Sequence, residues 1–275
     1  MNKSVYFSGV LFLGTVLPCI NINAQVPINS NVALQPSRGG FIIREQIRLS
    51  RGNMDGSGRD DESEQAILKS TFVYGATEKL TLMFNVPVVL FRKVENHSSG
   101  KESSTSGFAD FSILSKIRLY RDDFGINDTA RLDLIAGLSL PVGKEEFSSD
   151  SVNPVIGSVF TLVQGKHSFS TDVLWQFNTG DSRQGADLLR LNYAYIYRLL
   201  PDQYDSNNPT AVFASLELNG TYETNGDRKL FLSPGIQYVT TRWIAEATVQ
   251  IPVLQELEHQ AEKDFIVGIG FRYQF

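Results

Sequence analysis

The residues that could do covalent chemistry are few, and they stand in a polar segment. His97, Ser98 and Ser99 lie inside the run Val94-Glu-Asn-His-Ser-Ser-Gly-Lys-Glu-Ser-Ser104. A serine nucleophile needs a histidine within hydrogen-bond reach and a third group that orients this histidine. Catalysis also needs rigid placement, which a polar, low-complexity loop does not give. We therefore predict that the protein is not an enzyme and has no catalytic residues. An enzyme acting on lipids is the weakest alternative.

The sequence also gives little indication of metal binding or nucleic-acid binding. Asp55 and the run Asp60-Asp-Glu62 could attract a divalent cation, but an acidic loop is more often simply solvated. Cys19 is the only cysteine and stands in the N-terminal leader, so thiolate ligands are not expected in the mature chain. The formal net charge is −5, and no basic tract is present. We predict no metal, no cofactor and no nucleic-acid partner.

The charged residues with the clearest spacing alternate with apolar ones. Lys116 and Arg118, for example, alternate with Ile117 and Leu119. Because successive side chains of a β-strand point to opposite faces, one face of such a strand is apolar and the other charged. The predicted inward-facing residues, which would line a lumen, are Arg44, Arg48, Lys69, Asp110, Lys116, Arg118, Arg131, Asp133, Asp172, Arg190, Arg198, Glu217, Glu246 and Arg272. Basic residues outnumber acidic ones in this set.

The segment from Phe265 to Phe275 shows the alternation most clearly. One face carries apolar and aromatic residues, and the other carries glycine, arginine and glutamine. A transmembrane β-strand has this pattern and a length of roughly 9–11 residues. The segment resembles the closing strand of bacterial outer-membrane barrels, whose terminal phenylalanine is recognised by the barrel-assembly machinery. By this resemblance, Phe271, Tyr273 and Phe275 form the assembly signal.

The same alternation recurs along the chain and predicts an all-β protein, a twelve-stranded antiparallel transmembrane β-barrel. The connections alternate between shorter turns and longer polar loops, as in outer-membrane barrels with short periplasmic turns. The predicted strands are 41–50, 65–74, 80–91, 108–121, 130–141, 154–164, 168–178, 186–200, 210–220, 229–239, 243–252 and 264–275.

The N-terminus has the features of a secretory signal peptide. Lys3 precedes an apolar stretch from Val5 to Leu17, and Ile22-Asn-Ala24 is a plausible cleavage site. We therefore divide the chain into a signal peptide (1–24), a periplasmic lead-in (25–40) and the transmembrane barrel (41–275). The predicted location is the cell outer membrane, with membrane lipid, lipopolysaccharide and the barrel-assembly machinery as partners.

Three segments in the middle of the chain carry a family resemblance. They are Gly107-Phe-Ala-Asp-Phe-Ser-Ile-Leu-Ser-Lys-Ile-Arg-Leu-Tyr120, Leu134-Ile-Ala-Gly-Leu-Ser-Leu-Pro-Val-Gly143, and Asn153-Pro154 with the following strand up to Trp175-Gln-Phe-Asn-Thr-Gly180. Residues 65–200 resemble the outer-membrane family named after the putative MetA-pathway of phenol degradation, often described as transporters. Val142 departs from the usual threonine of that pattern. The resemblance implies an outer-membrane barrel that passes small molecules, and it identifies no substrate.

Two functions follow from a barrel with a charged lumen. The first is a channel or transporter for small solutes, with anionic or aromatic solutes as candidates because the inward-facing set is basic. In particular, Lys116, Arg118, Arg131, Arg190 and Arg198 would form a basic stripe. The second is a non-conducting barrel with a structural or interaction role, closed by its own ion pairs, because buried charges need partners.

The C-terminal segment generates the first testable prediction. Removal of Phe275 should reduce insertion of the barrel into the outer membrane, because the chain would lose the aromatic end of its closing strand. The change Gln274→Ser, on the opposite face, should have little effect. Insertion is measured as the amount of folded protein in the membrane fraction, and equal insertion of both variants would contradict the assembly signal.

Overall fold

The structure is a computed structural model, and it describes residues 25–54, 61–96, 101–125, 127–180, 185–203 and 209–275. The predicted signal peptide, the His97-Ser98-Ser99 group and the acidic residues Asp55 and Asp60 lie outside the described residues.

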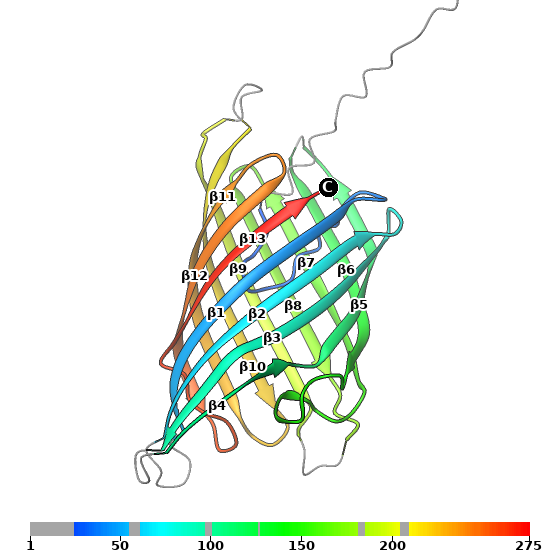
Figure 1. The fold of residues 1–275 in the computed structure, drawn as a ribbon. Coiled ribbons are helices and arrows are strands. Elements are labelled where there is room, and N and C mark those ends of the chain that lie inside the picture. Colours follow the sequence, from blue (N-terminus) through cyan, green and yellow to red (C-terminus); the bar gives the residue numbers. More distant parts are fainter. Residues whose placement is uncertain (1–24, 55–60, 97–100, 126, 181–184, 204–208) are drawn as a thin grey trace, which may run out of the picture.

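Antiparallel β-strands make up almost all of the described chain (Figure 1). No helix among the described residues is long and apolar enough to cross a membrane. The strands are β1 (Phe41–Met54), β2 (Asp61–Gly75), β3 (Leu80–Asn96), β4 (Lys101–Phe108), β5 (Phe111–Asp123), β6 (Thr129–Leu140), β7 (Asn153–Gln164), β8 (His167–Gln176), β9 (Leu188–Leu200), β10 (Ala211–Glu223), β11 (Arg228–Val239), β12 (Trp243–Glu256) and β13 (Phe265–Gln274), with one 3-10 turn, η1 (Glu145–Phe147).

The strands close into one ring. Apart from β4 and β5, each strand pairs with its neighbours in sequence, and β1 pairs with both β2 and β13, so the sheet closes on itself. Segments β4 and β5 both pair with β3 and are separated only by Ala109 and Asp110, so they occupy one strand position. The ring therefore has twelve strand positions, and the predicted twelve-stranded antiparallel barrel is confirmed.

Several strands are longer than predicted. The segments 51–64 and 92–107 were expected to be loops, but β1, β2, β3 and β4 extend the ladder into both of them. Arg51 pairs with Glu64, and Lys93 pairs with Ser104. These residues are polar on both faces of the ladder, so the apolar face that reveals a strand in the sequence is missing, although backbone hydrogen bonds still hold the strands together.

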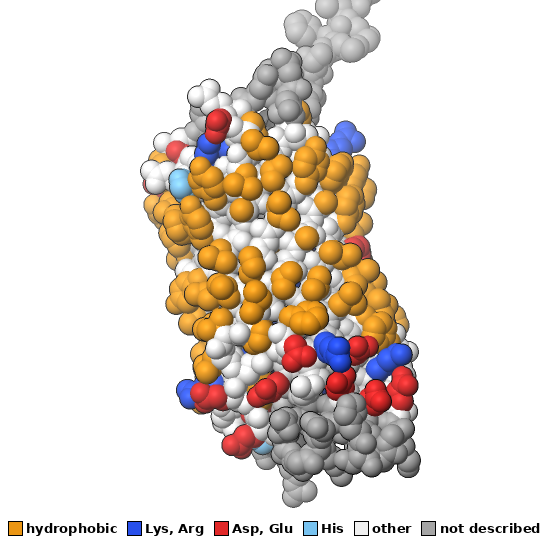
Figure 2. Space-filling model, turned by 90° about the vertical axis from the view of Figure 1, so that its left-hand side faces the viewer, with side chains coloured by type: hydrophobic (Ala, Val, Ile, Leu, Met, Phe, Trp, Pro, Cys, Tyr) orange, Lys and Arg blue, Asp and Glu red, His pale blue; other side chains and the backbone are white. Residues whose placement is uncertain are grey.

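The outer surface of the barrel is apolar around its middle. Figure 2 shows a broad band of hydrophobic side chains, with charged side chains gathered below it. Register explains the band, because the residues that alternate with the inward charges all point outward. On β9, for example, Leu191 and Tyr193 are 40% and 51% exposed. Outward apolar residues that remain this exposed leave a surface suited to an apolar surrounding.

The aromatic residues of the closing strand lie on this outer surface. The Phe275 side chain is 69% exposed, and its backbone N–H donates to the carbonyl of Phe41. The ring of Tyr273 packs edge-on against that of Phe275, at 4.8 Å between centroids. Phe271 is also exposed, beside the ring of Trp243. The assembly role of these aromatic residues remains a prediction.

The lumen holds the N-terminal segment. Residues 25–36, called the inner segment below, enter the barrel at the end that carries Phe275 and return to the same end, where residues 37–40 lead into β1 (Figure 1). The sequence predicts a periplasmic lead-in over residues 25–40 and does not indicate that part of it lies in the lumen. The inner segment instead fills part of the interior. The end of the barrel with Phe275 is called the C-terminal end below, and the opposite one the loop end.

An apolar cluster inside the barrel packs around the inner segment. Ala33 is fully buried among the side chains of Met83, Leu114, Ile135, Val155, Val159 and Leu174. These inward residues break the predicted rule that inward positions are polar or small. Contact with the inner segment explains them, because they cover Ala33 and each other instead of facing water.

Candidate functional site

Glu217 anchors the deepest turn of the inner segment. Its carboxylate, on β10, is fully buried and accepts hydrogen bonds from the backbone N–H groups of Ile28 (2.7 Å), Asn29 (3.0 Å) and Ser30 (2.9 Å). The Ser30 hydroxyl donates a further bond of 2.5 Å. Successive backbone N–H groups that converge on one anion form a strong binding arrangement. The segment thus wraps around a carboxylate of the wall.

Other wall side chains accept hydrogen bonds from the rest of the inner segment. Asp172 accepts a hydrogen bond from the backbone N–H of Asn31 at 2.5 Å. The hydroxyl oxygen of Thr161 accepts one from the backbone N–H of Ala33 at 2.9 Å. Asp133 accepts from the side-chain amide of Gln35 at 2.8 Å. Three predicted inward acids, Glu217, Asp172 and Asp133, therefore bind the segment, so they are not free to line an open pore.

Basic wall residues hold the carbonyl groups of the same segment. Arg44 donates to Ile28 O at 2.5 Å, Arg272 to Pro27 O at 2.7 Å, and Lys116 to Val32 O at 2.9 Å. Both arginines also pair with one carboxylate of β12, that of Glu246, at 2.6 and 2.7 Å. These interactions satisfy buried charges that would otherwise be costly in the barrel interior.

The predicted basic stripe does not form as one free surface. Lys116 is engaged by the inner segment, as described above. Arg118 lies 3.8 Å from Asp133, and Arg131 lies 3.4 Å from Asp123 near the C-terminal end. Arg198 is buried on the inner face of β9. Of the five residues, only Arg190 is exposed within the lumen and has no ion pair among the described residues.

The remaining predicted residues fall into two groups. Arg48 donates to Asn29 Oδ1 at 2.9 Å and to Gln250 Oε1 at 3.2 Å, and Lys69 is exposed on the inner face of the neighbouring strand. Asp110 instead binds the connection between β6 and β7. It accepts from the backbone N–H groups of Gly143 (3.2 Å) and Ser149 (2.7 Å), and thereby holds that connection in place. Its contacts do not extend to the inner segment.

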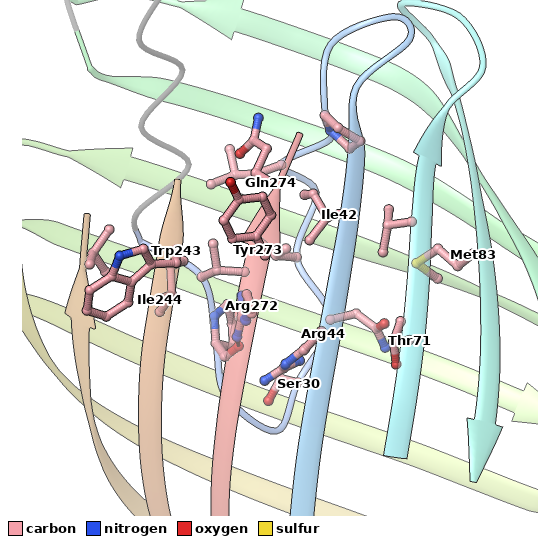
Figure 3. A pocket seen from close by; sticks show the side chains of 18 of the residues that line it. Ser30, Ile42, Arg44, Thr71, Met83, Trp243, Ile244, Arg272, Tyr273 and Gln274 are labelled. Atoms are coloured by element: carbon pink, nitrogen blue, oxygen red, sulfur yellow. Dashed lines mark hydrogen bonds between the residues drawn. The ribbon is translucent and has the colours of Figure 1, made fainter. Parts of the chain in front are cut away.

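A cavity of about 220 Å³ lies between the inner segment and the wall near the C-terminal end (Figure 3). Its lining is partly apolar, with Ile42, Met83 and Leu114, and partly polar, with Arg44 and Thr71. Arg272 and Ser30 of the inner segment, both labelled in Figure 3, also line it. This volume is large enough for a small organic molecule but is below that of typical drug-sized pockets.

A loop at the opposite end is fixed by Asp227, in the turn between β10 and β11. Its carboxylate accepts from the backbone N–H groups of Glu258 (2.8 Å) and His259 (3.2 Å) and from the His259 ring. Burial of the carboxylate favours its neutral form, but these hydrogen bonds together outweigh burial and lower the pKa of Asp227. The β12–β13 connection is therefore held to the rim at neutral pH.

Sequence reasoning missed the inner segment, although one signal for it existed. Glycines face inward on the two strands that flank β12, at Gly235 on β11 and at Gly268 and Gly270 on β13. A Cβ atom at Gly235 would lie only 2.5 Å from Ile28 Cδ1. Small residues on one side of a lumen leave space that another part of the chain can fill.

Comparison with known proteins agrees with this fold. Residues 62–275 match the model of a family described as "Putative MetA-pathway of phenol degradation". An outer membrane channel from Pseudomonas putida F1 is similar in structure, with a TM-score of 0.61 and 15% identity over 90% of this chain and 100% of that one. No curated protein matches the sequence.

Two autotransporter domains are similar at a lower level. The β domain of the Bordetella autotransporter BrkA gives a TM-score of 0.48 and 10% identity, and covers 87% of this chain and 100% of that one. The translocator domain of NalP from Neisseria meningitidis gives 0.45 and 14%, and covers 86% and 88%.

The contacts of Glu217 lead to a prediction about the inner segment. In Glu217→Ala, the backbone N–H groups of residues 28–30 lose their shared acceptor. Each buried donor left without a partner destabilises the bound position of the segment by roughly 1–3 kcal/mol. We expect hydrogen exchange of these amides, measured by mass spectrometry on the folded barrel, to accelerate by about tenfold or more. Glu256→Ala, at the exposed partner of Arg228, should leave the exchange unchanged. Equal exchange in all three proteins would mean that Glu217 does not hold the segment.

Proposed function

Since this chain belongs to the family of the putative MetA-pathway of phenol degradation, we propose that it is an outer-membrane channel for small solutes. The observation that carries this proposal is the combination of an apolar outer band with a closed, polar interior. In an outer membrane, the band faces lipid, and the interior offers a polar route through the hydrocarbon layer. The leader peptide predicted from the sequence supplies export, and the closing strand supplies the assembly signal.

The inner segment limits what this route can pass. Its backbone N–H groups donate hydrogen bonds to the carboxylates of Glu217 and Asp172 in the middle of the lumen. The cavity beside it, lined by β1, β2, β3, β5, β12 and β13, is a space near the C-terminal end in which a solute fits without displacement of the segment. We infer that small solutes pass on this side. Larger ones require the segment to leave its binding groups.

A non-conducting barrel is the second candidate, and the same segment favours it. Three wall acids and four wall cations bind residues 27–35, and such saturation of the lumen would suit a permanent plug. The barrel would then act through its outer surface or its loops. The two candidates differ in one measurable property, which is ion conductance.

The proposed location can be tested by fractionation. The protein should be recovered with the outer membrane, and the unboiled protein should migrate faster than boiled protein in a detergent gel, because a closed barrel resists unfolding. Recovery in the soluble periplasmic fraction would contradict the membrane location, whatever the conductance of the purified barrel.

Conductance separates the channel from the plugged barrel. In planar bilayers, we expect the native protein to give small single-channel steps and a variant lacking residues 28–35 to give steps several-fold larger, because the deletion empties the middle of the lumen. Glu256→Ala, at the rim, serves as a control and should conduct like the native protein. Silence of the native protein together with large steps in the deletion variant would favour the permanent plug. Silence of both would exclude a channel.

A further inference from the structure

Three cationic side chains meet in the lumen beyond the deepest turn of the inner segment. Arg48 and Lys69 come from the adjacent strands β1 and β2, and Arg190 comes from β9. In the ring order, β9 lies six strand-to-strand steps from β2 in either direction, so it belongs to the opposite wall. Arg48 lies two residues along β1 from Gln46, the register partner of Lys69, so Arg48 and Lys69 are diagonal neighbours on one wall. Arg48 and Arg190 both act on Lys69 electrostatically, so Lys69 is within electrostatic range of a cation on its own wall and of one on the opposite wall.

This group has no counter-charge of its own among the described residues. None of the three cations forms an ion pair there, and the Nε of Arg48 is buried without a hydrogen-bond partner. The remaining bonds of Arg48 go to the neutral amides of Asn29 and Gln250. Lys69 and Arg190 are exposed to the space of the lumen. Their charges thus meet in a place that a mobile ion can reach.

Nearby carboxylates are occupied by other groups. Asp172 acts on Arg190 electrostatically, but its oxygens accept bonds from the Asn31 backbone and the Asn192 side chain. Glu223, which also acts on Arg190, accepts bonds from the side-chain amides of Gln260 and Asn225. Glu217 and Glu246, which act on Arg48, are bound to the inner segment and to the two arginines Arg44 and Arg272. These four carboxylates reduce the positive potential without forming an ion pair with Arg48, Lys69 or Arg190.

The loop end adds a second group of basic residues. Arg92 and Lys229 act electrostatically on Lys263, in the connection between β12 and β13. The Lys229 ammonium donates to Gln260 Oε1 at 2.8 Å, and none of these three residues has an ion pair among the described ones. These basic residues stand beside acidic ones, such as Asp264, so the loop end carries both signs of charge (Figure 2).

We propose that Arg48, Lys69 and Arg190 form a binding site in the lumen for a small anion with two or more negative charges, such as a dicarboxylate. The site rests on the proposed function, since it would hold the solute before it passes the inner segment. Like charges that act on one another repel, and a divalent anion between them relieves more of this repulsion than a monovalent one. Arginine and lysine supply several donors that suit carboxylate oxygens.

Calorimetric titration of the folded barrel in detergent tests the site directly. The probe is malonate in dilute buffer, with acetate at equal ionic strength as the monovalent comparison, because salt screens such a site. We expect malonate to bind clearly more tightly than acetate. Lys69→Gln and Arg190→Gln should each weaken malonate binding by about tenfold, as expected for loss of one close charge in a partly wet interior. Arg228→Gln, which removes a rim arginine paired with Glu256, should bind malonate like the native protein.

The outcomes separate the site from the channel. Each variant must first show the gel shift of a folded barrel, so that a folding defect is not mistaken for lost binding. Malonate binding that is lost in Lys69→Gln and Arg190→Gln but kept in Arg228→Gln supports the site, even if the barrel proves not to conduct. Absent or acetate-like binding of malonate by a folded, conducting barrel would overturn the site and leave the channel intact. Equal weakening in all three variants would also overturn it, because binding would then reflect overall charge.

Discussion

The carboxylate of Glu217 is the interaction on which the interior of this barrel depends. It is fully buried, and its partners are backbone donors from a segment nearly two hundred residues away in the sequence. A buried carboxylate without partners would be strongly unfavourable, and three backbone N–H groups without acceptors would be as well. Each therefore requires the other. The inner segment has no regular secondary structure of its own, so these bonds, and those of Asp172 and Asp133, determine its path.

The need of buried polar groups for partners also explains which charged side chains of the wall are bound to the inner segment and which are not. Around the inner segment, acids accept from N–H groups and cations donate to carbonyl groups, so that Arg44, Lys116 and Arg272 are engaged. Beyond its deepest turn the segment offers nothing more to bind, and Lys69 and Arg190 remain exposed. The lumen is thereby divided into a filled part toward the C-terminal end and a basic, accessible part toward the loop end. A solute would experience these as two successive environments.

The outer surface follows a simpler rule. Closing the ring pairs each strand position on both sides along most of its length, which is the condition for a sheet surrounded by hydrocarbon. Side chains then need only alternate, with apolar residues outward and, inward, either polar residues or the apolar residues that pack around Ala33. Glu45 is an exception on the outer face of β1, and it accepts a hydrogen bond of 2.6 Å from the hydroxyl of Ser70 on the neighbouring strand. A short bond to a neighbour reduces the cost of placing a polar group there.

The sequence by itself determined the barrel and its register. A period of two is a local property, so the twelve strand positions and the inward direction of residues such as Arg190 and Glu217 could be predicted without knowledge of any contact. Strand ends were less certain, because β1 to β4 continue into segments that are polar on both faces. The family resemblance, carried by short motifs around Gly107 and Leu134, agreed with the match of residues 62–275 to the family model.

Only the tertiary structure decided which inward residues meet. Lys116, Arg118 and Arg190 share a face and a charge type in the sequence, yet one binds the inner segment, one lies beside Asp133, and one faces open space. Partners across a lumen are set by the closure of the ring, which brings β2 opposite β9, and by an irregular segment whose path no periodicity records. Alternation fixes the direction of a side chain relative to its own strand. Its partners depend on where the rest of the chain goes, which is a long-range property.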